Sequence, residues 1–131
     1  MVTYRAEGAI LRLIISGDVT ARERQALFDA IRSDPKVPPG AALLVDARES
    51  GITFKNATIE TRLGALLDGL GPKFSKVCAF IEPIHDPLYG KAFQRAGRKN
   101  GVHIGLFKDD ADALRWLAPY VKDSPKSSEL R

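Results

Sequence analysis

The sequence is poor in the residues that build cross-links and metal centres. Among its 131 residues there is one cysteine, and there are two histidines. The single cysteine, Cys78, excludes an internal disulfide and any metal site that needs several cysteines from one chain. Because a chain without disulfides fits a reducing compartment, we expect a cytoplasmic protein.

Long apolar runs are also missing. No stretch approaches the ~18 consecutive apolar residues that suggest a membrane-spanning helix. The first residues, MVTYRAEGAILRLIIS, place no basic segment ahead of their apolar run, and that run is interrupted by Arg12. We therefore expect neither a signal peptide nor an anchor, and we predict that this is not a membrane protein.

The charge balance is only modestly basic. The formal net charge is +4, and charged residues make up 27% of the chain. Nucleic-acid binders usually concentrate much more positive charge on one face, so we predict no nucleic-acid partner. One basic helix face, with Lys91, Arg95, Arg98 and Lys99, either meets an acidic partner or is simply solvated.

The chain that remains has the composition of one globular domain. Hydrophobic residues make up 44% of it, which is ordinary for a folded protein. Apolar runs predict strands near Thr3–Ala6, Ala9–Ser16, Ala41–Ala47, Ser75–Pro83 and Val102–Phe107. Helical patterns begin at Thr20, at Asn56 or Thr58, at Asp86 and at Asp109.

This alternation predicts an α/β fold. After the first hairpin, strands and helices follow one another, which is typical of right-handed crossovers and parallel strands. We predict a mixed, largely parallel five-stranded sheet with four helices, in the order ββαβαβαβα. The domain should cover residues 1–121, with a flexible polar tail at 122–131.

Local signals give more detail for single helices. Thr20 and Glu23 have the spacing of a capping box, and Asp109 is placed to cap the last helix. Pro119 is expected to break that last helix. The helix after Asp86-Pro87 should turn one stripe inward: Leu88, Tyr89, Ala92, Phe93 and Ala96.

Polar residues gather where the parallel strands end. In open α/β sheets, ligands bind at the carboxyl edge of the strands, where these loops are neighbours. The predicted binding residues for a ligand or partner there are Asp46, Arg48, Ser50, His85 and Lys108. Asp46 is expected to end the central strand and to accept backbone N–H bonds from the residues that follow.

The residues at this edge do not match the known patterns of catalytic or metal sites. Asp46, Ser50 and His85 could form a hydrolytic triad, but Ser50 lacks the G-x-S-x-G elbow. Cys78, Glu82, His85 and Asp86 match no zinc spacing. A receiver domain would need acidic residues where the second strand ends in Ser16-Gly17. Phosphate-binding glycine loops are absent. We predict no catalytic residues, no metal and no cofactor, and hence no enzyme.

The order of motifs resembles one known group of proteins. A hairpin, a capped helix after SGDVT and a central LLVDAR strand are followed by LYGKAF and by VHIGLFKDDADALRWL. This arrangement resembles the small bacterial SpoIIAA-like proteins of the STAS (sulfate transporter and anti-sigma factor antagonist) superfamily, also called STAS/SEC14-type. The resemblance covers about residues 3 to 121.

The resemblance implies a fold and a choice of functions. It implies a mixed sheet with outer helices and a regulatory or binding domain without catalysis. In the wider superfamily, anti-sigma antagonists are switched by phosphorylation of a serine in a D-S-S-G-like turn. The equivalent region here, Phe54 to Thr58, holds Thr58 as its only hydroxyl, which makes Thr58 the phosphorylation candidate.

The leading hypothesis is therefore a non-enzymatic binding domain. It would act at the carboxyl edge, through a protein partner or through a small apolar or anionic ligand. The alternatives are a phospho-switched anti-sigma factor antagonist and a small hydrolase using Ser50 and His85. A homodimer is compatible with a domain of this size that has apolar strands near a sheet edge.

Overall fold

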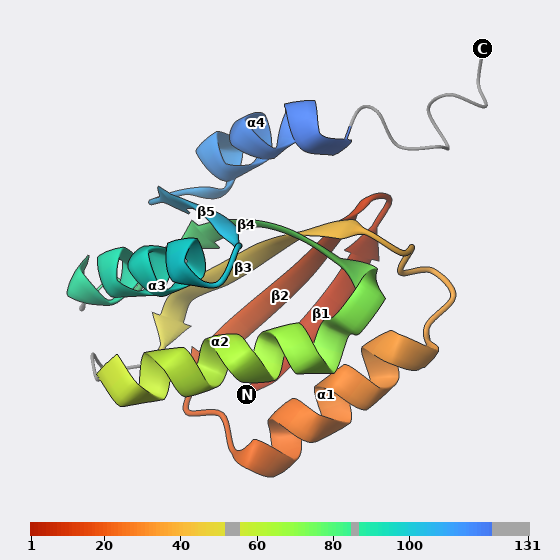
Figure 1. Ribbon diagram of the computed structural model, residues 1–131, viewed down its shortest axis with the longest axis horizontal. Helices are drawn as coiled ribbons and strands as arrows, with labels where there is room; N and C mark the ends of the chain where they lie inside the picture. The colour runs from red at the N-terminus through yellow and green to blue at the C-terminus, as the bar shows by residue number, and fades with distance from the viewer. Residues whose placement is uncertain (52–55, 85–86, 122–131) are drawn as a thin grey trace.

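The domain is built on one mixed sheet of five strands (Figure 1). The computed structural model describes residues 1–51, 56–84 and 87–121. The strands are β1 (Val2–Glu7), β2 (Ile10–Gly17), β3 (Ala41–Ser50), β4 (Phe74–Ile81) and β5 (His103–Phe107). β1 pairs with β2 antiparallel, and all later pairs are parallel. The predicted fold class is thereby confirmed.

Four helices follow the strands in the predicted order. They are α1 (Ala21–Ser33), α2 (Asn56–Leu70), α3 (Pro87–Lys99) and α4 (Asp110–Val121), with a short 3-10 helix, η1, at Gly71–Lys73. The predicted tail, 122–131, lies outside the described residues, as do His85 and Asp86.

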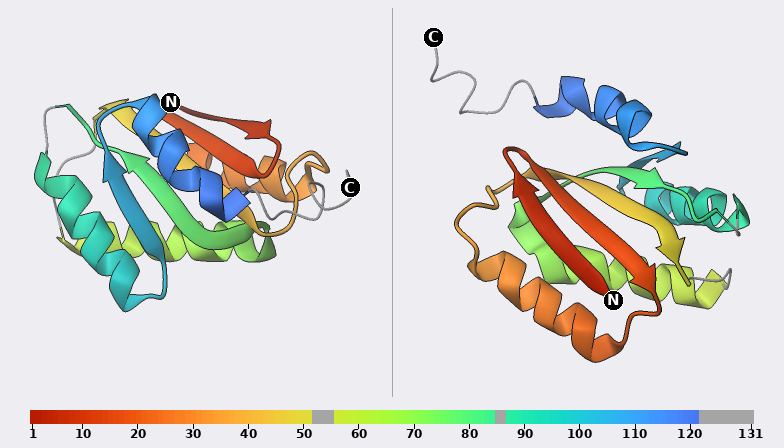
Figure 2. Two further views of the ribbon diagram at one scale, coloured as in Figure 1. Left: turned by 90° about the horizontal axis from the view of Figure 1, so that it is seen from above. Right: turned by 180° about the vertical axis from the view of Figure 1, so that it is seen from behind.

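The strand order determines which face each helix covers. The strands lie in the sequence order β1-β2-β3-β4-β5. Crossovers of one hand that always add the next strand on the same side place their helices on the same face. Accordingly α1, α2 and α3 lie below the sheet in Figure 1, and α4 lies above it, crossing the strands as Figure 2 shows from above.

The two faces have cores of different size. The larger core lies between the sheet and helices α1–α3 and includes Leu11, Leu43, Leu63 and Phe93. The smaller core lies under α4 and contains Ala42, Leu44, Ala79, Ile81, Ala113 and Leu117. The many alanines on this second face let α4 approach the strands closely.

The helix ends follow the local signals closely. Thr20 and Glu23 form the complete capping box at α1. At the other end of α1, Lys73 donates from Nζ to the carbonyl oxygens of Ile31 and Asp34, at 3.0 and 2.7 Å. Asp109 accepts from the backbone N–H of Asp112 at 2.8 Å, as predicted for the α4 cap.

Three local predictions are wrong. The central strand does not end at Asp46 but continues to Ser50, because a bulge restores its pairing with β2 at Ser16 and Gly17. α4 is not broken at Pro119 and runs to Val121. A proline in the last turn costs only one backbone hydrogen bond. The rings of Trp116 and Tyr120 pack against each other across this turn, with centroids 5.2 Å apart and planes tilted by 48°.

The third correction concerns the inner stripe of α3. Leu88 is 62% exposed, whereas Tyr89, Phe93 and Ala96 are buried as predicted. Leu88 lies in the first turn of α3, about 100° around the helix from Tyr89, so both cannot face the core there.

The packing of α1 against α2 generates a test at two glycines of α2. A Cβ at Gly69 would lie 2.5 Å from ring carbons of Phe28, whereas one at Gly64 would meet nothing within 4 Å. We expect Gly69→Ala to lower the free energy of unfolding by about 1–3 kcal/mol, because α1 and α2 must separate. Gly64→Ala, the matched control, should raise it by about 0.5–1 kcal/mol through reduced backbone entropy. Urea unfolding measures both, and equal effects would contradict close packing at Gly69.

Candidate ligand-binding site

The predicted pair Asp46 and Arg48 meets directly in β3. Arg48 donates from Nε to Oδ1 of Asp46 at 3.0 Å and from Nη2 to Oδ2 at 2.7 Å. Oδ1 of Asp46 also accepts the backbone N–H of Arg48, at 3.2 Å. These bonds from Arg48, and then its charge, hold the pKa of Asp46 below its ordinary value.

This pair belongs to the face covered by α4. Leu44 packs under α4, and alternation along the strand places Asp46 on the same side. Arg12 of β2 lies there too: it donates from Nε to Glu7 at 3.0 Å and from Nη1 to Asp110, the first residue of α4. The bond to Asp110 raises the pKa of the Arg12 guanidinium. The face under α4 therefore holds paired charges.

Ser50 and Lys108 do not join this pair. Ser50 is 1% exposed, and its Oγ has no hydrogen-bond partner among the described residues. Lys108 forms an ion pair with Glu82 at 3.7 Å and is itself largely exposed. His85 lies outside the described residues, and of Thr58 only the helical backbone is described. The predicted cluster is thus divided among separate places along the edge.

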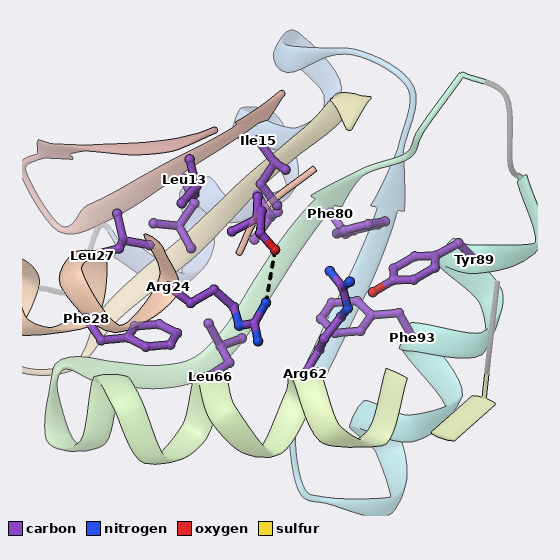
Figure 3. A pocket seen from close by; sticks show the side chains of 13 residues that line it. Leu13, Ile15, Arg24, Leu27, Phe28, Arg62, Leu66, Phe80, Tyr89 and Phe93 are labelled. Carbon is purple, nitrogen blue, oxygen red and sulfur yellow. Dashed lines mark hydrogen bonds between the residues drawn. The ribbon is translucent and has the colours of Figure 1, made fainter. Parts of the chain in front are cut away.

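A cavity lies on the opposite face of the sheet, where the sequence predicts no binding residue (Figure 3). It has a volume of about 90 Å³, lies between the sheet and helices α1, α2 and α3, and is partly open to the surface. The apolar side chains that line it are Val2, Leu13, Ile15, Val19, Leu27, Phe28, Val45, Leu66, Phe80 and Phe93. We call it the helix-face cavity.

The helix-face cavity lies toward the carboxyl edge of the sheet. Ile15 and Phe80 are close to the ends of their strands, and Val19 lies in the loop after β2. Arg24 and Tyr89 come from the first turns of α1 and α3. The cavity therefore lies near the predicted edge, but on the face opposite to Asp46 and Arg48.

Three polar side chains interrupt the apolar lining. Arg24 and Arg62 extend from α1 and α2 toward the sheet, and the hydroxyl of Tyr89 points toward the Arg62 guanidinium (Figure 3). Arg24 donates from Nη1 to the carbonyl oxygen of Val19 at 3.3 Å. The Nε of Arg62 is buried without a hydrogen-bond partner among the described residues.

A sequence signal for Arg62 exists. Ile59, Arg62 and Leu66 are spaced three and four residues apart, which puts them on one helix face. Ile59 and Leu66 are buried, so the same spacing turns Arg62 toward the core. The helical pattern indicates this direction, but only the assembled α1–α3 layer shows that the side chain reaches a cavity.

The fold defines the class of this protein. It is a small α/β domain with a SpoIIAA-like fold, with three helices on one face of the sheet and one on the other. A search of protein-family models finds no match. A search of curated proteins also finds none.

The assignment of a SpoIIAA-like fold is supported by a solved structure. It is that of an uncharacterized protein of the DUF3478 family with a SpoIIAA-like fold, from Shewanella loihica PV-4. The two structures superpose with a TM-score of 0.61, over 89% of this chain and 92% of that chain, at 21% sequence identity. At this identity the likeness establishes the fold, and the resemblance found in the sequence is confirmed at that level.

Two further properties follow from the described residues. Within 1–51, 56–84 and 87–121, no helix has the length and apolarity needed to cross a bilayer. In the same residues, histidine, cysteine and carboxylate side chains do not form a group of three that could hold a metal ion.

The Asp46–Arg48 pair predicts a pH-dependent effect. In Arg48→Met, Asp46 keeps the backbone N–H bond but loses both guanidinium bonds, so we expect its pKa to rise part of the way toward ~3.9. A lowered folded-state pKa adds stability above the unfolded value, and this stability is lost as the pH falls through the folded value. Acid unfolding of Arg48→Met should therefore begin at a higher pH.

Carbon-detected NMR titration of the Asp46 carboxyl measures this shift. Arg115→Met is the control, because Arg115 pairs with Asp112 on the exposed side of α4. This control should leave the pKa of Asp46 unchanged. The same titration curve in wild type and Arg48→Met would show that the pair does not set this pKa.

Proposed function

We propose that this protein is a non-enzymatic binding domain that holds a small, mostly apolar molecule in the helix-face cavity. The observation that carries the proposal is the cavity itself, which ten apolar side chains line at the carboxyl edge of the sheet. Small-molecule sites are typically concave and apolar, with few polar groups that fix orientation. Arg24, Arg62 and Tyr89 are such polar groups here.

The state of the potential nucleophiles supports a role without covalent catalysis. Cys78 is fully buried, and burial raises the pKa of its thiol, which disfavours the reactive thiolate. Ser50 is also buried, and its hydroxyl bonds to no described base. Because neither side chain is accessible as a nucleophile, these observations favour a binding protein over a hydrolase.

The phospho-switched anti-sigma antagonist has less support. A kinase needs an exposed hydroxyl in an extended segment, and Ser50 is buried at the end of β3. Thr58 stays the sequence-based candidate for this role. Mass spectrometry after incubation with a cognate kinase tests it, and stoichiometric phosphate on Thr58 would favour the switch over the cavity.

The binding proposal can be tested with a neutral probe of matching size. Methyl NMR titration with n-butanol should shift the resonances of Leu13, Leu27 and Leu66, which line the helix-face cavity. The methyl groups of Leu44 and Leu117 report on the core under α4, on the other side of the sheet. They should not move if the probe enters the proposed cavity.

A cavity-filling variant provides the second half of this test. Leu66→Phe adds volume to the cavity wall, so we expect it to weaken butanol binding by about tenfold. Leu66→Met is the matched control, because it nearly conserves volume and should bind as wild type does. If butanol shifts no cavity methyl group, the proposal fails, and the result favours a domain that acts through a protein partner.

A further inference from the structure

Among the described residues, the two arginines of the helix-face cavity lack the carboxylate partners that Arg12 and Arg48 have. Arg12, which is 8% exposed, bonds to the carboxylates of Glu7 and Asp110. Arg48 bonds to Asp46 through two guanidinium nitrogens. Neither Arg24 nor Arg62 forms an ion pair with any described residue, and the described lining of the cavity contains no acidic side chain.

Two guanidinium groups without acidic partners are energetically unfavourable in an apolar cavity unless an anion binds there. A half-buried guanidinium loses part of its hydration, and an unmet buried donor costs free energy. Two guanidinium groups that line one apolar cavity also repel each other more strongly than they would in water. A bound anion would satisfy the buried Nε of Arg62 and reduce this repulsion.

The geometry of Arg62 favours a planar anion. Guanidinium presents parallel N–H donors in a fork that matches the two oxygens of a carboxylate. The apolar lining offers few other polar contacts: the second arginine and the hydroxyl of Tyr89. A phosphate can use the same fork, but it has more oxygens to satisfy than a carboxylate, and the rest of the lining is apolar. We therefore favour a carboxylate.

The volume indicates how much of the ligand's apolar part the cavity can cover. At about 30 Å³ for each water-sized group, the cavity of about 90 Å³ holds about three methylene or methyl groups. We infer that the ligand is a short-chain aliphatic monocarboxylate, with its carboxylate on Arg62 and its alkyl chain against Leu13, Val45 and Phe80. This inference rests on the proposed function, since it names the ligand class for the same cavity.

The test compares two ligands of four carbons that differ in charge. Sodium butyrate and n-butanol are titrated separately into the wild-type protein, at constant ionic strength maintained with sodium chloride, and cavity methyl groups are followed by NMR. We expect butyrate to bind about tenfold or more tightly than butanol, because hydrogen bonds to charged partners are strong.

Variants at Arg62 show whether this residue recognises the negative charge of butyrate. Arg62→Met keeps an apolar stem, so we expect butanol binding to persist while the preference for butyrate is lost. Arg98→Met is the matched control, because Arg98 is exposed on α3 and should leave the preference intact. The Leu44 and Leu117 methyl resonances under α4 verify that each variant is folded.

Thermal unfolding gives a second readout that a purely structural arginine would not produce. Without ligand, Arg62→Met should melt at the same temperature as the wild type or higher, because an unpaired charge is removed. Added butyrate should raise the melting temperature of the wild type but not that of Arg62→Met. A structural role for Arg62 would instead lower the melting temperature of the variant without ligand.

The outcomes separate this inference from the function on which it rests. If butanol binds as tightly as butyrate, or if Arg62→Met binds butyrate as the wild type does, the carboxylate assignment is overturned while the cavity remains a binding site. If neither compound shifts a cavity methyl group, both the assignment and the proposed function fail.

Discussion

The order of strands in the sheet is the constraint on which the other features depend. Each strand lies beside the one that precedes it in the chain, so the described sheet has no point at which the direction of winding reverses. In doubly wound sheets, ligands bind at such a reversal, between helices on opposite faces. Here helices α1–α3 share one face, and the helix-face cavity lies between them and the strands.

Charged side chains are consequently arranged differently on the two faces of the sheet. Under α4, alanines bring the helix close to the strands, and each buried or half-buried charge has a partner, as Arg12 and Asp46 show. Under α1–α3, larger side chains leave a cavity, and guanidinium groups reach it without acidic partners among the described residues. One face pairs its own charges, while the guanidinium groups on the other have no acidic partner among the described residues, which is the basis of the proposed anionic ligand.

Most of the fold could be predicted because its signals are local. The capping box of Thr20 and Glu23 and the cap at Asp109 each involve residues only three positions apart. The end of the central strand could not be predicted in this way, since it depends on a bulge against a neighbouring strand. The prediction for Leu88 failed because tertiary packing decides which side chains of the first turn of α3 face the core.

The site was less predictable for the same reason. Arg12 pairs with Asp110, which is 98 positions away in the sequence, so no local pattern reveals the partner. The edge that carries the site follows from parallel strands, but the choice of face depends on strand order. Helical spacing indicates that Arg62 points inward, yet its lack of a counter-charge is a property of the whole helix layer.

The burial of the single cysteine has a practical consequence for measuring the motions of this domain. Cys78 lies in the central part of β4, is fully buried, and is the only thiol in the chain. A thiol reagent can reach it only after the larger core has opened. Its rate of labelling in the folded protein therefore reports the free energy of that opening, in the same way as amide hydrogen exchange but at one defined position. Labelling of the native Cys78 thus measures how often the core around the cavity opens, and no engineered probe is needed.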